Sequence, residues 1–375
     1  MPPGILRQIR NIQPTKNLHT TMKKLLTILA LASAITTSTQ AQFASTNLLL
    51  LRVGDGTSAL VNTTGPISLL EITRSGSVVQ TINIATNSLQ VSGTATSEGQ
   101  MSLSPDGSIL TIAGYVPPFA GSGSLSGRTA AQAPRGYVTV NASGTVSSST
   151  ILSNAYSTDN IRSGVTGDGS AFWFTGSPGS GSGIMAFTGG ATNQIADINS
   201  RVIKIYNNDL YYSTGSGTQG IYRISGTQTS SNAAPVSFLT GVAGQGTSPY
   251  DFALSADGNT MYLADDGIGV QKFTFDGSAW SLAYNFTNGL GSSRAFGLDV
   301  VFGATNQVLW TSPTNVWSVI DAGAAANATS IYTAGANYAL RGLEATVVPE
   351  PSTYALLALA GAGLAACRLR RRARR

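Results

Sequence analysis

The sequence predicts an all-β fold, a six-bladed β-propeller of residues 43–347 that closes by pairing its C-terminal strand with its N-terminal strands. The first observation is a four-strand unit that recurs along this span. The second is that the two ends of the span carry incomplete units that complement each other. The third is composition: 43 of the 375 residues are glycine and only 10% are charged, where soluble proteins average about 25%. The apolar residues of the sequence occur in short, dispersed runs, and this pattern disfavours coiled coils and multi-span membrane proteins.

The recurring unit consists of four short segments, here called strands A to D. Strand A begins near Gln100, Arg162, Arg201, Asp251 and Phe296, and ends in a tight turn. Strand B is expected at Leu110–Ala113, Ala171–Thr175, Leu210–Ser213, Met261–Ala264 and Val308–Thr311. Strand C is expected at Gly136–Val140, Gly183–Phe187, Gly220–Ile224, Gly269–Phe275 and Asn315–Ile320. Strand D is expected at Ser149–Leu152, Gln194–Ile198, Pro235–Leu239, Trp280–Phe286 and Thr329–Thr333. The segments are β-branched or aromatic and are bounded by turn residues, as strands are.

The ends of the body supply a sixth unit in two pieces. The N-terminal part contains B, C and D strands at Leu48–Val53, Ile67–Thr73 and Ser77–Ile84, with no preceding A strand. The C-terminal part ends with an unpaired A strand at Arg341–Val347. A β-sandwich or a solenoid could hold the same number of strands, but a solenoid has no need for a split terminal unit. Radial repetition leaves only short, protected edges, so these observations favour the propeller.

The N-terminus has the pattern of a secretory signal peptide at residues 22–41. Lys23 and Lys24 precede an apolar run, and Thr39-Gln40-Ala41 is a small-x-small cleavage site. We therefore expect signal peptidase to cut between Ala41 and Gln42. Residues 1–21 resemble neither a signal nor a domain, and we interpret them as an upstream start-site extension.

The C-terminal segment, residues 348–375, has three ordered parts. Pro349-Glu350-Pro351 is followed by the apolar stretch Tyr354–Cys367, and six arginines occupy the last eight positions. A helix of this stretch would be about 21 Å long, which is shorter than the ~30 Å hydrocarbon core of a bilayer. The arginine cluster should remain cytoplasmic, leaving the body outside.

These three parts resemble the PEP-CTERM sorting signal of Gram-negative bacteria. The resemblance implies cleavage near Pro349-Glu350-Pro351 by exosortase, a membrane-embedded protease, after transient anchoring in the inner membrane. It also implies a secreted or cell-surface protein and association with exopolysaccharide and biofilms. An ordinary tail anchor is the alternative interpretation.

Charge and residue usage exclude several classes of function. Eleven basic and 16 acidic residues lie between residues 43 and 348, so the body has a net charge of −5, and nucleic-acid binding is disfavoured. The only histidine, His19, precedes the signal peptide, and the only cysteine, Cys367, lies in the C-terminal segment. The body therefore cannot build a Ser-His-Asp triad, a Cys-His pair or a histidine-ligated metal site.

Candidate binding residues are charged side chains on the A strands and at their entries, which are expected to line the channel. They are Asp251, Arg294, Asp299, Arg341 and Glu344. They could form a mixed-charge pocket for a polar ligand such as a sugar, or an oxygen-ligand calcium site. The alternative is a ring of mutually paired charges. The Asp-Gly turns lack the spacing of calcium loops, so no cofactor is expected, and calcium is the one metal left open.

Two hypotheses of function follow. The first is a non-enzymatic, exported surface or matrix propeller that acts in binding or adhesion. The second is a hydrolase or lactonase that uses carboxylates and a metal on the rim of long loops, the longest of which is Gly114–Arg135. The second requires oxygen ligands from several blades to converge on one point, and the body is poor in acids and lacks histidine.

Overall fold

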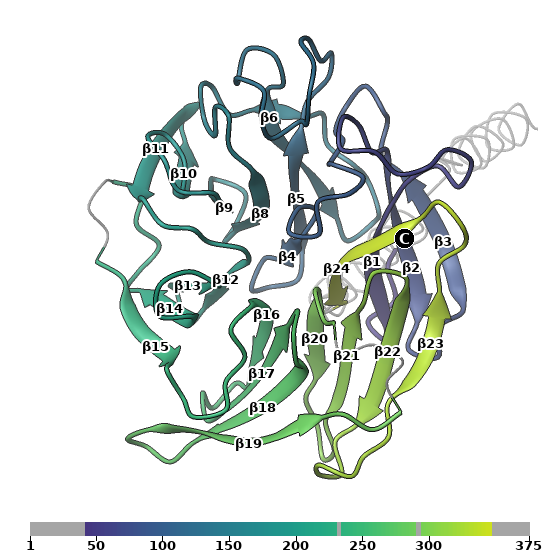
Figure 1. Ribbon diagram of the computed structural model, residues 1–375, viewed down its shortest axis with the longest axis vertical. Helices are drawn as coiled ribbons and strands as arrows, with labels where there is room; N and C mark the ends of the chain where they lie inside the picture. The colour runs from purple at the N-terminus through teal and green to yellow at the C-terminus, as the bar shows by residue number, and fades with distance from the viewer. Residues whose placement is uncertain (1–41, 231–233, 290–293, 347–375) are drawn as a thin grey trace, which may run out of the picture. The chain divides into compact units, whose positions relative to one another are not determined.

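The computed structural model describes residues 42–230, 234–289 and 294–346. These residues form six four-stranded antiparallel sheets placed around a common centre (Figure 1). The chain is thus an all-β six-bladed propeller, as the sequence predicts. The signal peptide and the C-terminal sorting segment lie outside the described residues. Within the described ranges there is no helix, and hence none that could cross a membrane.

Each blade runs from an inner A strand to an outer D strand. The first blade contains β24 (Ala339–Ala345), β1 (Asn47–Val53), β2 (Ile67–Thr73) and β3 (Val78–Asn83). The second contains β4 (Met101–Leu103), β5 (Ile109–Tyr115), β6 (Arg135–Asn141) and β7 (Thr150–Ile151). The third contains β8 (Ile161–Thr166), β9 (Ala171–Gly176), β10 (Ile184–Thr188) and β11 (Ala191–Ala196).

The remaining three blades follow the same order. The fourth contains β12 (Ile203–Tyr206), β13 (Asp209–Thr214), β14 (Gly220–Ile224) and β15 (Val236–Thr240). The fifth contains β16 (Pro249–Leu254), β17 (Thr260–Asp265), β18 (Gly269–Phe275) and β19 (Trp280–Phe286). The sixth contains β20 (Leu298–Val301), β21 (Gln307–Thr311), β22 (Asn315–Ile320) and β23 (Thr329–Thr333).

The predicted split blade is confirmed by the pairing of β24 with β1. The two strands are antiparallel, with Leu48 opposite Ala345 and Val53 opposite Ala339. All seven residues of β24 are buried. The chain thus closes its ring with main-chain hydrogen bonds between residues almost 300 positions apart.

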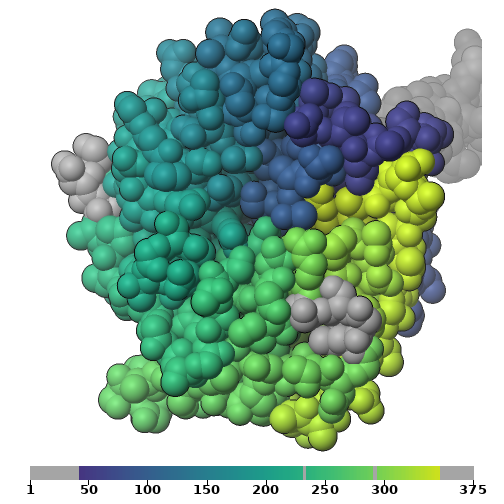
Figure 2. Space-filling model, viewed as in Figure 1, coloured from purple at the N-terminus to yellow at the C-terminus, as the bar shows by residue number. Residues whose placement is uncertain are grey.

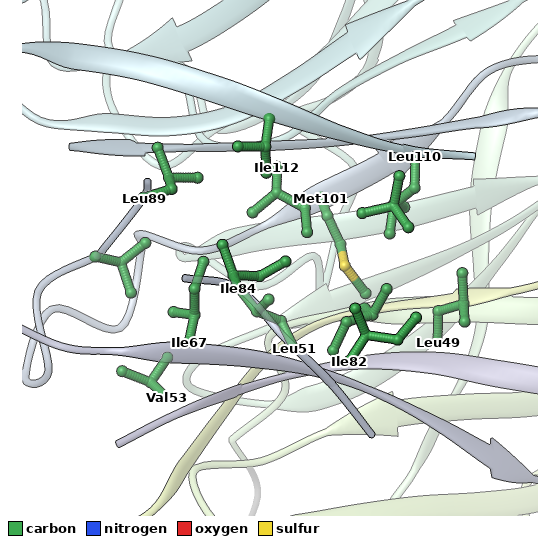
Figure 3. Packing of buried hydrophobic residues seen from close by; sticks show 14 of the residues in the cluster. Leu49, Leu51, Val53, Ile67, Ile82, Ile84, Leu89, Met101, Leu110 and Ile112 are labelled. Carbon is green, nitrogen blue, oxygen red and sulfur yellow. The ribbon is translucent and has the colours of Figure 1, made fainter. Parts of the chain in front are cut away.

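The core consists of one hydrophobic cluster at each of the six junctions between neighbouring blades. The run Leu48–Leu51 shows how one strand contributes to two of these clusters, because successive side chains of a strand point to opposite faces of the sheet. Leu49 and Leu51 pack against Met101 and Leu110 of the second blade (Figure 3). Leu48 and Leu50 pack toward Leu309 of the sixth blade. A sheet covered on both faces needs continuous rather than alternating apolar residues.

The largest difference from the predicted strand starts is at β11, which begins three residues early. β11 starts at Ala191 rather than Gln194, because β10 and β11 are joined by the two-residue turn Gly189-Gly190. Both glycines have positive φ, of 59° and 84°. Such two-residue turns match the twist of a hairpin and favour glycine. The Gly-Gly pair was the available signal for this boundary.

Candidate binding site in the central channel

The innermost strands surround the centre of the ring (Figure 1), and the blades pack closely around it (Figure 2). The candidate residues divide between the two ends of these strands. Asp251 on β16, Asp299 on β20 and Glu344 on β24 belong to one cluster. Arg294, which precedes β20, and Arg341, near the start of β24, lie toward the end that carries the long loops.

Lys204 on β12 lies at the centre of the cluster of candidate acids. Its Nζ lies 3.0 Å from Oδ1 of Asp251 and 3.2 Å from Oε1 of Glu344. The three side chains are at most 8% exposed and come from three different blades. Asp299 completes the cluster, because its charge acts on both Lys204 and Glu344. The name channel cluster is used below for Lys204, Asp251, Asp299 and Glu344.

Sequence reasoning identified the three acids of the channel cluster and missed its lysine. Lys204 stands between Ile203 and Ile205 in a strand expected to be innermost. A long cation flanked by buried apolar neighbours must find a counter-charge on its own face of the strand. That context was the signal that could have found it.

Two acids of the channel cluster also fasten inner strands to each other. Asp251 accepts hydrogen bonds from the backbone N–H of Phe252 at 2.7 Å and of Leu298 at 2.9 Å. Asp299 accepts one from the N–H of Ala345 at 2.7 Å. These bonds link β16 to β20 and β20 to β24. Asp251 is completely buried, and its carboxylate accepts these bonds and contacts Lys204; that it binds a ligand stays a prediction.

Burial dominates the electrostatics of the channel cluster. It raises the pKa of Asp251 to about 6, although the charge of Lys204 opposes the shift. Burial likewise raises the pKa of Glu344, and the charges of Asp299 and Asp251 add to this effect while Lys204 opposes it. For Lys204, burial lowers the pKa, but the nearby carboxylates outweigh it and raise the pKa above its usual value. Lys204 is therefore charged near neutral pH, and the surplus of acids favours retention of a proton on Glu344.

The channel cluster opens into a hollow at the end of the strands where the short A–B turns lie. Lys204, Tyr206, Asp299 and Glu344 line a cavity of about 250 Å³, beside the turn residues Pro105 and Asn207. A neighbouring hollow of about 430 Å³ shares Tyr206 and Asp299 and adds Arg74 and Phe302. The accessible side of the cluster therefore faces the short turns and not the long loops. Its ammonium and carboxyl groups can exchange hydrogen bonds with a polar ligand.

The two candidate arginines make different contacts. Arg341 is 2% exposed and donates to the carbonyls of Gly93 and Ala95, at 3.2 Å each, and of Leu340 at 2.9 Å. Arg294 is partly exposed and pairs with Asp266, its Nε lying 2.5 Å from Oδ1. Burial lowers the pKa of Arg341 to about 10. Arg341 thus holds the connection between β3 and β4 against the closing strand.

A further buried acid, Glu98, was not identified from the sequence. It accepts hydrogen bonds from the N–H of Ser92 at 2.9 Å, the hydroxyl of Tyr115 at 2.8 Å and the amide of Asn160 at 2.5 Å. Burial raises its pKa. With its oxygens occupied in this way, Glu98 joins the second and third blades near their long loops.

The residues that the structure describes contain no group of three or more histidine, cysteine or acidic side chains arranged to hold a metal ion. In the channel cluster, an ammonium group occupies the position between Asp251 and Glu344 that a cation would need. Calcium binding therefore remains a prediction without a described ligand set.

The PEP-CTERM protein-sorting motif matches residues 347–375. No curated protein sequence matches the chain. Among solved structures, a chain of a nidogen/laminin complex is similar at 11% identity, with a TM-score of 0.47, over 80% of this chain and 99% of that one. A protein assigned as a 6-phosphogluconolactonase from Bacteroides uniformis ATCC 8492 is similar at 11% identity, with a TM-score of 0.40, over 76% of this chain and 81% of that one.

The match at residues 347–375 confirms the resemblance found in the sequence. The motif implies exosortase-dependent export, with transient anchoring in the membrane before processing. The chain is therefore a six-bladed β-propeller that carries a PEP-CTERM protein-sorting motif at its C-terminus.

Proposed function

We propose that the processed protein is a non-enzymatic binding protein of the cell surface or extracellular matrix, and that it associates with exopolysaccharide. The observation that carries the proposal is the place of the sorting motif. It begins at residue 347, two positions after β24 ends, so that the segment to be processed directly follows the strand that closes the ring. Processing there would leave every described strand in the released or attached body.

The geometry of the body supports binding more than catalysis. A ring fastened by main-chain pairing at its ends is a rigid scaffold, and rigid scaffolds position binding groups well. The cavity lined by Lys204, Asp299 and Glu344 offers charged and hydrogen-bonding groups to a polar portion of a ligand. The hydrolase or lactonase hypothesis needs a metal centre, and no observation on the described residues favours one.

The experiment is to express the full chain in an exosortase-containing host and in the same host lacking exopolysaccharide. We expect the processed protein to sediment with the polysaccharide in the first host and to remain soluble in the medium of the second. Release of soluble protein by enzymatic degradation of the polysaccharide would support the proposal further. An identical distribution in the two hosts would contradict it.

A further inference from the structure

A groove lies on the outside of the ring, between the fourth and fifth blades. One wall is formed by β15 and residues 241–243, and the other by the end of β18, the turn after it and the start of β19. The two outer strands belong to neighbouring blades (Figure 1). The groove has a volume of about 930 Å³. It is separate from the channel cluster.

Three partly exposed aromatic side chains form an apolar patch in this groove, namely Phe238, Phe275 and Trp280. The rings of Phe238 and Trp280 touch across the junction of the blades, with centroids 5.5 Å apart. Within the fifth blade, the centroids of Phe275 and Trp280 are 5.2 Å apart. Phe238 also packs on Tyr211, at 4.9 Å. The rings are thus held in place before any ligand arrives, which reduces the loss of side-chain entropy on binding.

Hydroxyl groups surround the aromatic patch. Ser237, Ser278 and Ser281 are exposed, and Thr240 is half-buried. The hydroxyl of Ser237 and the indole N–H of Trp280 form no hydrogen bond with any residue that the structure describes. Both groups are therefore available to a ligand. Rings with adjacent donors and acceptors are suited to a ligand that has apolar faces and polar edges.

The groove contains no charged side chain in its lining. The acids of the adjacent turns, Asp257 and Asp276, are exposed. A hydrogen bond from the Ser255 hydroxyl lowers the pKa of Asp257. Hydrogen bonds from the N–H groups of Ala279 and Ser278 lower the pKa of Asp276. Their negative charges repel a polyanion. Nothing in the groove compensates the charge of an anionic ligand.

We propose that this groove binds a chain of neutral polysaccharide, with the C–H faces of its sugars stacked on Trp280 and its neighbours and its hydroxyls bonded to the serines. A neutral sugar presents the two kinds of surface that the groove offers. The inference goes beyond the proposed function by assigning a second site and a charge class of ligand, and it rests on that function only in requiring an extracellular glycan. An extended peptide along the free edge of β15 is the competing occupant.

The test is affinity electrophoresis of the secreted protein in gels that contain a neutral glycan, such as xyloglucan or galactomannan, or an anionic one, such as alginate. We expect retardation by a neutral glycan and none by alginate. Trp280→Ala should weaken retardation at least tenfold, and Trp280→Phe should retain part of it. Tyr332→Ala, which removes a partly buried ring from the outermost strand of the sixth blade, is the matched control and should bind as the wild type does.

A second pair of variants avoids any loss of packing. Ser237→Glu adds a charge to the groove at an exposed position, and Thr81→Glu adds one to the outermost strand of the first blade. Only the first should abolish retardation. If neutral glycans retard the protein and Ser237→Glu leaves this unchanged, the groove is not the site, although the proposed function stands. If no glycan retards it, or if only a peptide library labels β15, the inference is wrong.

Discussion

The ammonium of Lys204 lies 3.2 Å from the carboxyl group of Glu344, and this contact joins the inner strand of the fourth blade to the strand that closes the first. Within its sheet β24 pairs only with β1, so the contact with Lys204 across the channel adds to the bonds that Leu340, Gly342 and Ala345 make to other blades. Ring closure and the channel cluster are therefore one structural feature.

Lys204→Met should destabilise the fold strongly at neutral pH. It leaves Asp251 and Glu344 buried without their counter-charge, and breaking a buried ion pair from one side costs about 3–5 kcal/mol. Chemical denaturation measures the change. Arg223→Met is the control, because its pair with Asp209 is partly exposed, and we expect a loss below about 1 kcal/mol. Similar losses in the two variants would contradict the cluster's role.

The unfolding free energy should fall as the pH rises from about 4 to about 6. In the folded state the pKa of Asp251 is raised to about 6, and that of Glu344 is raised as well. The folded protein therefore binds more protons than the unfolded chain in this window, and stability declines as these protons are lost. Urea titrations at several pH values measure the decline.

Asp251→Asn should make the unfolding free energy fall less steeply between pH 4 and 6, because the variant lacks the proton that Asp251 binds in the folded state. Asp55→Asn is the control, because hydrogen bonds from the N–H groups of Ser58 and Thr57 lower the pKa of that exposed acid to about 2. Its removal should leave the slope between pH 4 and 6 unchanged. A wild-type protein that gains stability across this window would rule out the raised pKa values.

Deleting residues 341–375 should yield an insoluble or oligomeric body, whereas deleting residues 349–375 should leave folding intact. The longer deletion removes most of β24 and exposes the edge of β1, where Leu48–Leu51 form an apolar run. An unpaired apolar edge is a template for aggregation. Solubility and the midpoint of thermal unfolding compare the two proteins, and equal values would contradict closure through β24.

Arg135→Lys should loosen the long connection between β5 and β6. The guanidinium of Arg135 is fully buried and donates to the carbonyls of five residues. These are Leu125, Ser126, Arg128, Ala133 and Asp159. An ammonium cannot reproduce this fork of donors, and we expect a loss of about 2–4 kcal/mol with faster proteolysis within residues 116–134. Arg52→Lys, at a partly exposed site, should have little effect, and equal proteolysis of both variants would argue against this role.

Replacing Glu350 by alanine should trap the protein in the inner membrane of an exosortase-containing host. The change removes the acid of the Pro349-Glu350-Pro351 triplet and leaves the apolar stretch and the arginine cluster in place. Membrane fractionation and the mass of the secreted protein report the outcome. Glu344→Gln, inside the body, is a control for loss of an acid nearby and should still be processed. Secretion of the Glu350 variant at the normal mass would show that another route releases the protein.

The strands and their order could be predicted from the sequence because the patterns that mark them are local. The short β-branched or aromatic runs and the Asp-Gly turns that bound them are both visible within about ten residues of sequence. The split of the first blade is equally visible, since one end lacks an A strand and the other has one too many. Only β11 deviated clearly, where the Gly189-Gly190 turn sets the start of the strand.

The channel cluster was decided by the tertiary structure. Lys204, Asp251 and Glu344 are separated by 47 and 93 positions, and nothing local records that their strands face one another across the channel. The number of blades and the curvature of the ring set that geometry. The same holds for the groove, because Phe238 and Trp280 belong to different sheets and meet only where two blades pack together. The sequence by itself determined the blades and the sorting segment, whereas the packing of one blade against the next decided which side chains share a site.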